Sequence, residues 1–376
     1  MSWARDCTKS GGAIQAKLTL YAAVPSIAAT YLNYQRSFPG YNSLGSSNKG
    51  PTSRMTVQRI YDTVADDFSR VNDLIIQRLS SDVPLVEKIA QYIIESGGKR
   101  LRPLLVLLSS QAAGYTRDDH LKLAAVIEFL HTATLLHDDV VDTSDMRRGR
   151  STANARWGNA PSVLVGDFLY ARAFEMMVEL ESLPIMNVLS HATAVIAEGE
   201  VMQLMNVKNP DLTEAQYMQV IHNKTAMLFE AASHTGALLA GANDSQERAL
   251  RDYGKHLGLA FQLVDDVLDY RGDAETMGKN VGDDLAEGKV TLPLIHAMAQ
   301  GTDEARQLIR QAIRKGGLDD LSDILALVET SGALEYTMER ARAEASKASD
   351  CLTQLENSPY RTALEQLTEV AVARVS

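Results

Sequence analysis

Cysteine is almost absent from this 376-residue sequence, which contains only Cys7 and Cys351. Because the two residues lie at opposite ends of the chain, we expect neither a disulfide framework nor a cysteine metal site. This sparse use of cysteine is typical of a protein that works in a reducing compartment.

Long apolar runs and positive charge are also scarce. Residues 18–32 are mildly apolar, but the segment contains Pro25 and is too short to cross a membrane, so we expect no transmembrane segment. The formal net charge of -11 argues against a nucleic-acid partner, which requires a basic surface. If the substrates are anionic, divalent cations and clustered Lys and Arg side chains must reverse the local field.

The first 54 residues differ from the rest, because Asp6 is their only acidic residue and Ser, Gly, Asn, Pro and Tyr are frequent. They show no sustained amphipathic pattern, so we expect a disordered extension at 1–54 and a catalytic domain at 55–376. A translation-start artefact before Met55, a transit peptide and a secretion signal are the alternatives. We expect a cytoplasmic protein, or a protein of the mitochondrial matrix if the extension is a transit peptide.

From residue 57 onward, helical patterns alternate with short Gly, Pro, Asn and Asp punctuation, and strand-type alternation is almost absent. The patterns favour helices at 57–79, 85–96, 103–113, 121–142, 162–181, 185–207, 213–240 and 245–270, with shorter helices after Pro293. Some segments are apolar nearly all round, which is typical of helices in the centre of a bundle. We therefore predict an all-α fold, a single large helical bundle with a central active-site cavity.

Two aspartate clusters share one spacing, and each ends an apolar helical segment. They are Asp138, Asp139 and Asp142 in HDDVVD, and Asp265, Asp266 and Asp269 in VDDVLD. On a helix, the first and last Asp of each cluster share a face roughly 6 Å apart, so each pair can hold a metal ion. Mg²⁺ fits best, because it prefers oxygen ligands and bridges carboxylates to phosphates. One such cluster could be a solvated helix end, but two copies favour a shared diphosphate site.

Basic side chains lie close to both clusters in sequence. GGKRLRP supplies Lys99, Arg100 and Arg102, and DMRRGR supplies Arg147 and Arg148. Arg can hold phosphate oxygens through two parallel hydrogen bonds. His131 lies two helical turns before Asp138, and the second cluster is flanked by Lys224, Thr225, Gln262, Lys279 and Lys289. Taken singly, a basic run is more often a solvated face, and a lone histidine is more often a core residue.

Together these motifs resemble the trans-isoprenyl diphosphate synthase family from about residue 57 to the C-terminus. GGKRLRP, LLHDDVVD followed by RRG, Lys224-Thr225, FQLVDDVLD and GDDLAEGKVTLPL occur in the family's order. The resemblance implies an all-α bundle of the isoprenoid synthase type, a homodimer, and the substrates isopentenyl diphosphate and an allylic diphosphate, with farnesyl diphosphate expected as the allylic primer.

The resemblance also implies residue roles. Two Mg²⁺ ions would bind Asp138 and Asp142, and a third would bind Asp265. Isopentenyl diphosphate would be held by Lys99, Arg102, His131 and Arg148. The allylic diphosphate would be faced by Arg147, Lys224, Thr225, Gln262, Lys279 and Lys289. We expect all six clustered aspartates and Lys224 to be catalytic.

The expected chemistry follows from the charges. Metal ions and cationic side chains stabilise departing pyrophosphate, so that the allylic C–O bond ionises to a delocalised carbocation. The double bond of isopentenyl diphosphate attacks this carbocation, and loss of a proton restores an allylic product that is one unit longer. No protein nucleophile is needed.

The length of the product depends on the helix that carries Asp138. In short-chain members of the family, bulky aromatic residues lie four or five positions before the first Asp, where this chain has Thr134 and Ala133. Leu130 and Val126, one and two turns further back, are apolar and not aromatic, so we expect an open tunnel. The expected product is octaprenyl diphosphate, used for the side chain of a respiratory quinone such as ubiquinone.

Other functions fit less well. A shorter-chain synthase and a noncatalytic subunit of a heteromeric synthase are the main alternatives, although such subunits often lose one Asp cluster. A terpene cyclase would usually lack GGKRLRP and carry a different second metal motif. A purely structural helical protein would leave the coincident motifs unexplained.

Overall fold

Helices make up almost all of the regular structure in the computed structural model, which describes residues 51–271, 281–316 and 319–373, with side chains from residue 57. In this part of the chain, the strands are β1 (Met146–Arg147) and β2 (Arg150–Ser151), which pair antiparallel with Met146 opposite Ser151. The predicted all-α fold class is therefore confirmed.

The first half of the bundle contains these helices in chain order: α3 (Pro51–Asp62), α4 (Ala65–Arg78), α5 (Pro84–Glu95), α6 (Leu101–Ala112), α7 (Asp119–Val141), α8 (Ala153–Trp157), α9 (Asn159–Val178) and α10 (Leu183–Asn206). The second half contains α11 (Glu214–Ile221), the π-helix η1 (His222–Ala226), α12 (Met227–Ala240), α13 (Asp244–Arg271), α15 (Asp283–Ala286), α16 (Leu292–Gln300), α17 (Asp303–Lys315), α18 (Leu321–Thr330), α19 (Ala333–Cys351), the 3₁₀ helix η2 (Leu352–Gln354) and α20 (Pro359–Val372).

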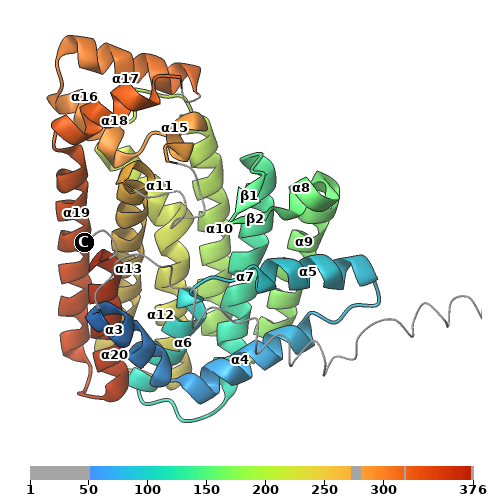
Figure 1. Cartoon of the computed structure of the whole chain (residues 1–376). Helices are drawn as coiled ribbons and strands as arrows, with labels where there is room; N and C mark the ends of the chain where they lie inside the picture. The colour runs from blue at the N-terminus through green and yellow to red at the C-terminus, as the bar shows by residue number, and fades with distance from the viewer. Residues whose placement is uncertain (1–50, 272–280, 317–318, 374–376) are drawn as a thin grey trace, which may run out of the picture. The chain divides into compact units, whose positions relative to one another are not determined.

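The long helices run side by side, and the short helices α15 to α18 gather at one end (Figure 1). α7 packs along α9, and α13 packs along both α12 and α19. The core between them is formed by large side chains with no solvent exposure, such as Leu104 and Phe129. Burial of apolar surface of this kind stabilises a fold by about 25 cal/mol per Å².

Two predicted helices differ from the observed ones. The segment 57–79 is divided into α3 and α4 by a turn at Thr63 and Val64. Both residues are β-branched and weak helix formers, and Val64, at φ -131°, is buried in the core. The segment 213–240 is interrupted by η1, whose wider turn has no simple sequence signal.

None of the described helices is both long enough and apolar enough to cross a membrane. The boundary between an extension at 1–54 and a catalytic domain at 55–376 stays a prediction.

Candidate active site

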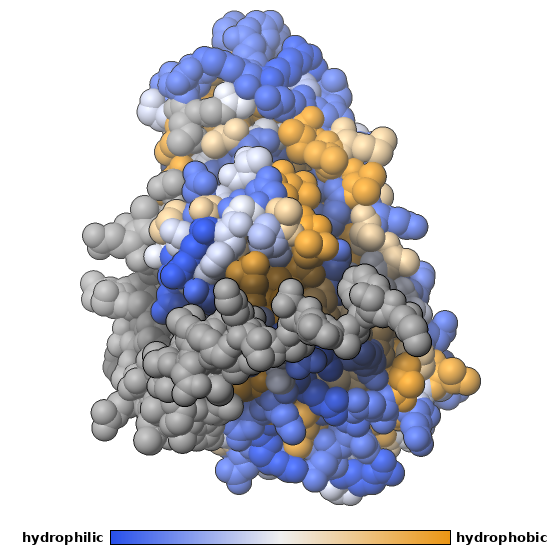
Figure 2. All heavy atoms as spheres, turned by 90° about the vertical axis from the view of Figure 1, so that its right-hand side faces the viewer, coloured by the Kyte–Doolittle hydropathy of each residue, from blue (hydrophilic) through white to orange (hydrophobic). Residues whose placement is uncertain are grey.

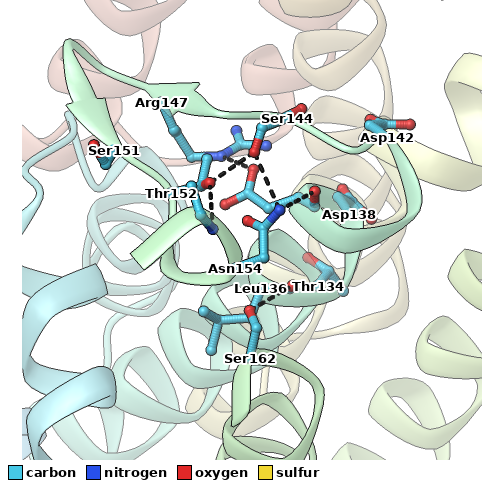
Figure 3. Close-up of polar contacts among 12 residues, drawn as sticks. Thr134, Leu136, Asp138, Asp142, Ser144, Arg147, Ser151, Thr152, Asn154 and Ser162 are labelled. Atoms are coloured by element: carbon cyan, nitrogen blue, oxygen red, sulfur yellow. Dashed lines mark hydrogen bonds and ion pairs between the residues drawn. The ribbon is translucent and has the colours of Figure 1, made fainter. Parts of the chain in front are cut away.

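The first aspartate cluster lies in the last turn of α7. Asp138 and Asp142 are both half-buried, and the backbone N–H of Asp142 donates to the Asp138 carbonyl at 2.8 Å, which places the two side chains one helical turn apart. Figure 3 shows both at the end of the helix. Burial and the neighbouring Asp142 raise the pKa of Asp138, while the positive charge of Lys224 opposes the rise. A cation shared by the two carboxylates would relieve this cost.

Asp139 turns in a different direction. It is fully buried, and Arg147 Nε donates to its Oδ1 at 2.7 Å. Its Oδ2 has no hydrogen-bond partner among the described residues. Arg147 belongs to β1, so this ion pair ties the β1–β2 hairpin to α7 and orients the Arg147 guanidinium.

The turn between α7 and the hairpin is fixed by two side chains from the start of α8 (Figure 3). Thr152 Oγ1 donates to the Ser144 carbonyl at 2.6 Å, and Asn154 Nδ2 donates to the carbonyls of Asp139 and Ser144 at 3.1 and 3.2 Å. Thr152 also caps α8, because it accepts from Ala155 N. The RRG segment is therefore held in place by residues that follow it in the chain.

In the second cluster, on α13, the three aspartates have different environments. Asp265 is half-buried, whereas Asp266 and Asp269 are 2% and 4% exposed. The Asp266 carboxyl accepts hydrogen bonds from Tyr217 Oη and, at 2.7 Å, from Gln262 Nε2. Burial and the charge of Asp284 raise the pKa of Asp266 to about 8. Asp266 therefore anchors α11 to α13, and Asp265 is the most accessible carboxylate of the cluster.

Lys289 connects the two clusters. It follows α15, whose chain is bonded back to α13 because Gly282 N donates to the Asp269 carbonyl at 2.9 Å. Lys289 Nζ lies 2.9 Å from Asp142 Oδ2 and 2.6 Å from Glu287 Oε2. Burial alone would lower the pKa of Lys289, but the nearby carboxylates outweigh burial and raise it. The segment that follows the second cluster therefore reaches the first cluster.

Lys224 projects from η1 toward the first cluster. Its Nζ lies 3.9 Å from Asp138 Oδ2 and donates to Glu200 Oε2 at 2.6 Å and to Gln203 Oε1 at 2.7 Å. The neighbouring Thr225 Oγ1 donates to Gln262 Oε1 at 3.0 Å, which links η1 to α13. The wide π-turn thus directs two consecutive side chains toward different partners.

The sequence reasoning missed Glu200 and Gln203. Both lie on α10, three residues apart and so on one face of an otherwise apolar helix, and this spacing was the available signal. Burial and the charge of Asp138 raise the pKa of Glu200 to about 6. Gly199 allows the close approach of α10 to η1, since a Cβ there would lie 2.7 Å from Lys224 N.

A second group of basic residues surrounds His131. Arg102 Nη1 lies 3.2 Å from His131 Nε2, and its guanidinium stacks 4.4 Å above the Phe229 ring. Burial and the positive charge of Arg148 lower the pKa of Arg102 to about 10, although Glu128 opposes the shift. Burial and Arg102 also lower the pKa of His131 well below its ordinary value, so its ring is neutral at pH 7.

Arg148 joins this group through the glycine turn before α6. It donates to the Gly97 carbonyl, and its guanidinium lies against Gly98, where a Cβ would come within 2.6 Å of Nη1. The carbonyl of Lys99, in the same turn, accepts from Tyr61 Oη. Arg100 does not join the group, because it donates to Asn72 Oδ1 at 2.6 Å and to the Ile94 carbonyl at 3.2 Å.

The donors fit a magnesium ion that shares its ligands with phosphate. Asp138 and Asp142 offer adjacent oxygens, and burial raises the pKa of Asp138, so a cation would be favoured there. Across residues 51–271, 281–316 and 319–373, no group of three or more His, Cys, Asp or Glu side chains converges closely enough to hold a metal ion. Such a site must therefore be completed by water or by substrate oxygens. Lys279 lies outside the described residues.

The residues expected to control product length lie on α7 as predicted. Val126, Leu130 and Ala133 are at most 1% exposed, whereas Thr134 is half-buried and donates to the His131 carbonyl at 2.8 Å. Their effect on product length stays a prediction.

Comparison with known proteins now identifies the molecule. Residues 83–329 match the family model described as polyprenyl synthetase. The chain is 54% identical over 321 residues to the octaprenyl diphosphate synthase of Escherichia coli (strain K12), covering 85% of this chain and 99% of that protein. It is 50% identical over 319 residues to the all-trans-nonaprenyl-diphosphate synthase (geranyl-diphosphate specific) of Rhodobacter capsulatus, covering 85% and 98%.

Among solved structures, the fold is similar to the crystal structure of polyprenyl synthase from Caulobacter crescentus CB15 complexed with calcium and isoprenyl diphosphate. The TM-score is 0.83 at 48% identity, with 85% of this chain and 98% of that chain covered. The fold is therefore that of the all-α isoprenoid synthases. The chain belongs to the polyprenyl synthetase family, and the predicted family and enzyme class, a prenyltransferase, are confirmed. The family is magnesium-dependent in general.

Proposed function

We propose that this long-chain trans-polyprenyl diphosphate synthase makes octaprenyl diphosphate from isopentenyl diphosphate and farnesyl diphosphate, at a site between its two aspartate clusters. The observation that carries this proposal is the 2.9 Å contact between Lys289 and Asp142, which joins the segment after the second cluster to the first cluster. Cationic side chains from η1, the β1–β2 hairpin and the turn before α6 would bind the anionic diphosphate next to this contact.

Aspartates from both clusters would hold the metal ions. Asp138 and Asp142 would bind from α7, and Asp265 would bind from α13, with three ions in total when substrate is bound. Bound magnesium supplies charge neutralisation for the departing pyrophosphate. Lys224, Lys289 and Arg147 would lie around the same diphosphate, and Asp139 would orient Arg147 through their 2.7 Å contact. Thr225 and Gln262 would complete the allylic side.

Isopentenyl diphosphate would bind at the second basic group. Arg102 and Arg148 would hold its diphosphate, with Lys99 from the glycine turn beside them. His131 would act as a neutral hydrogen-bond partner, because burial and Arg102 hold its pKa well below the ordinary value. His131 of this group and Asp138 of the first cluster lie on one helix, α7, seven residues apart, so the double bond can be directed at the ionising carbon.

Incubation of the purified chain alone with labelled isopentenyl diphosphate, farnesyl diphosphate and Mg²⁺ tests this function. We expect incorporation that falls by several orders of magnitude in Asp138→Asn and Asp265→Asn, as for loss of a major electrostatic stabiliser. Asp303→Asn is the control, because Asp303 has an 82% exposed side chain in α17. If the wild-type chain is inert until another protein is added, it is a noncatalytic subunit instead.

We also propose a homodimer formed through α9 and α10. Leu204 and Met205 on α10 are 60% and 78% exposed, and Leu164 on α9 is 65% exposed. Figure 2 views the side of the molecule where α8 and α9 lie and shows apolar surface there. Exposed large apolar side chains of this kind mark interaction surfaces, and a second copy would supply a matching apolar face.

Sedimentation analysis of Leu204→Glu tests the dimer. The wild-type chain should sediment as a dimer and the variant as a monomer, because a buried unpaired charge opposes association. A wild-type monomer at micromolar concentration would contradict the proposed dimer.

A cytoplasmic location and a role in supplying the side chain of a respiratory quinone remain part of the proposed function, with the mitochondrial matrix as the alternative location.

A further inference from the structure

A buried carboxylate lies beneath the second basic group. Glu128 is on α7, three residues before His131 and therefore on the same face of the helix, and it is 7% exposed. Its Oε1 is 3.9 Å from Arg100 Nε, and both side chains are almost fully buried. Its Oε2 has no hydrogen-bond partner among the described residues. The roles assigned so far to the site do not use this group.

The charges of three guanidinium groups act on Glu128, and Arg100 lies 3.9 Å from it. Burial raises the pKa of Glu128, and the positive charges of Arg100, Arg148 and Arg102 each oppose that rise. Arg102 Nε is also buried without a hydrogen-bond partner in the described chain. In turn, the Glu128 charge favours the protonated forms of both Arg102 and Arg148, whereas Arg148 disfavours that of Arg102, and Arg147 and Arg100 disfavour that of Arg148. Glu128 is thus the shared counter-charge of a cluster that would otherwise repel itself.

The contacts of Arg100 fix the position of the side chain that lies beside the Glu128 carboxylate. Arg100 begins α6 in the left-handed conformation at φ 44° and is bonded to Asn72 of α4 and to the Ile94 carbonyl of α5. A non-glycine residue adopts this conformation only when its surroundings compensate for it. Arg100 and Glu128 therefore form a fixed base joining α4, α5, α6 and α7, above which Arg102 and Arg148 can be aligned.

We propose that Glu128 is a positioning residue for isopentenyl diphosphate, whose buried carboxylate keeps Arg102 and Arg148 converged on the diphosphate before it binds. This inference rests on the proposed function, which places isopentenyl diphosphate at Arg102 and Arg148. Glu128 does not touch the substrate in this account, and it acts through the two arginines.

Two effects of removing the Glu128 charge have opposite signs. A purely electrostatic effect would strengthen anion binding, because the site would become more positive. A positioning effect would weaken anion binding, because the guanidinium groups would separate and must be brought together again when the diphosphate binds. Preorganisation governs such sites when the donors converge on one ligand, so the second effect should prevail.

Steady-state kinetics of Glu128→Gln test the proposal, since Gln keeps the shape and removes the charge. We expect KM for isopentenyl diphosphate to rise about tenfold, while KM for farnesyl diphosphate and kcat stay within about twofold. Glu344→Gln is the matched control, because Glu344 is a 5% exposed carboxylate paired with His256 and Lys347 away from the site. It should reduce thermal stability without changing the ratio of the two KM values.

Two further variants separate failure of the role of Glu128 from failure of the proposed isopentenyl diphosphate site. Glu128→Asp keeps the charge at a shorter reach and should raise KM for isopentenyl diphosphate less than Gln does, and it replaces Gln if that variant does not fold. An unchanged or lowered KM for isopentenyl diphosphate in the folded variant overturns the role of Glu128. Arg102→Lys tests the underlying site: if it also leaves this KM unchanged, the proposed location of isopentenyl diphosphate is wrong, whereas a rise in Arg102→Lys alone leaves that location intact.

Discussion

Lys289 and Asp142 are 147 positions apart in the sequence, yet Lys289 Nζ donates to Asp142 Oδ2 at 2.9 Å. Each belongs to one of the two aspartate-rich regions, and Glu287 holds the same ammonium at 2.6 Å. In this arrangement the ammonium neutralises carboxylates that would face the proposed site for metal and diphosphate. Because Lys289 can turn from the carboxylates to an incoming diphosphate, it would contribute to binding of the allylic substrate.

Lys289→Gln should lower kcat/KM for the allylic diphosphate by about a hundredfold, because a buried cation beside the diphosphate is lost. Lys315→Gln is the control, since Lys315 pairs with Asp319 at the surface, where their side chains are 60% and 76% exposed. Steady-state kinetics with each substrate varied in turn measure kcat/KM for both substrates. Equal kinetic constants in Lys289→Gln and the wild type would show that Lys289 does not bind the allylic diphosphate.

Gly199→Ala should impair catalysis through η1. Its Cβ would lie 2.7 Å from Lys224 N and 2.9 Å from the Asn223 carbonyl carbon, and both are backbone atoms that cannot rotate away. The π-turn must shift and carry Lys224 with it, so we expect kcat to fall at least tenfold, because small misplacements of catalytic groups have large effects. Unchanged kcat would show that Lys224 is not sensitive to the position of α10.

Both aspartate clusters and the basic runs of the candidate site could be predicted from the sequence, because they are local patterns. The different environments of the residues within each motif could not be predicted. Asp138 and Asp139 are neighbours, but only the structure shows that Asp139 is buried against Arg147. Likewise, Arg100 and Arg102 are equivalent in a motif, whereas the left-handed conformation of Arg100 turns it away from the site. Such differences depend on tertiary contacts, which a single sequence does not encode locally.

The fold was predictable at the level of helices for the same reason, since a period of 3.6 residues is a local signal. The division between α3 and α4 was missed because Thr63 and Val64 continue the apolar pattern while the backbone turns. Glu200 was missed because acidic residues on a largely apolar helix have many ordinary explanations, and its contact with Lys224 at 2.6 Å joins residues 24 positions apart.

The Glu344 pair should stabilise the bundle in a pH-dependent manner. Burial alone would raise the pKa of Glu344, but hydrogen bonds from His256 and Lys347 outweigh burial and lower it from 4.5 to about 2. A lowered carboxyl pKa adds stability above the ordinary value and loses it as the pH falls toward the folded value. Glu344→Gln should therefore cost about 1–3 kcal/mol at pH 7 and less below pH 4. Urea unfolding at both pH values measures the difference, and an equal cost at both would contradict it.

Ala133→Phe should shorten the product without abolishing catalysis. Ala133 is fully buried on α7, five residues and so more than one helical turn before Asp138, and a phenyl ring there would fill volume without touching the aspartates. We expect products of roughly fifteen or twenty carbons, because overpacking acts on volume rather than on charge. Chromatography of dephosphorylated products measures this change. An unchanged product length would show that the chain does not run along this face of α7.

The most direct test of the central claim is the length of the product made by the purified wild-type chain from labelled isopentenyl diphosphate, farnesyl diphosphate and Mg²⁺. Octaprenyl and nonaprenyl synthases are similar to this chain at 54% and 50% identity, so product length is the property that a direct measurement must supply. The absence of aromatic side chains at Ala133 and Thr134 predicts an octaprenyl product as the main species. A product that stops at farnesyl or geranylgeranyl length would contradict the account.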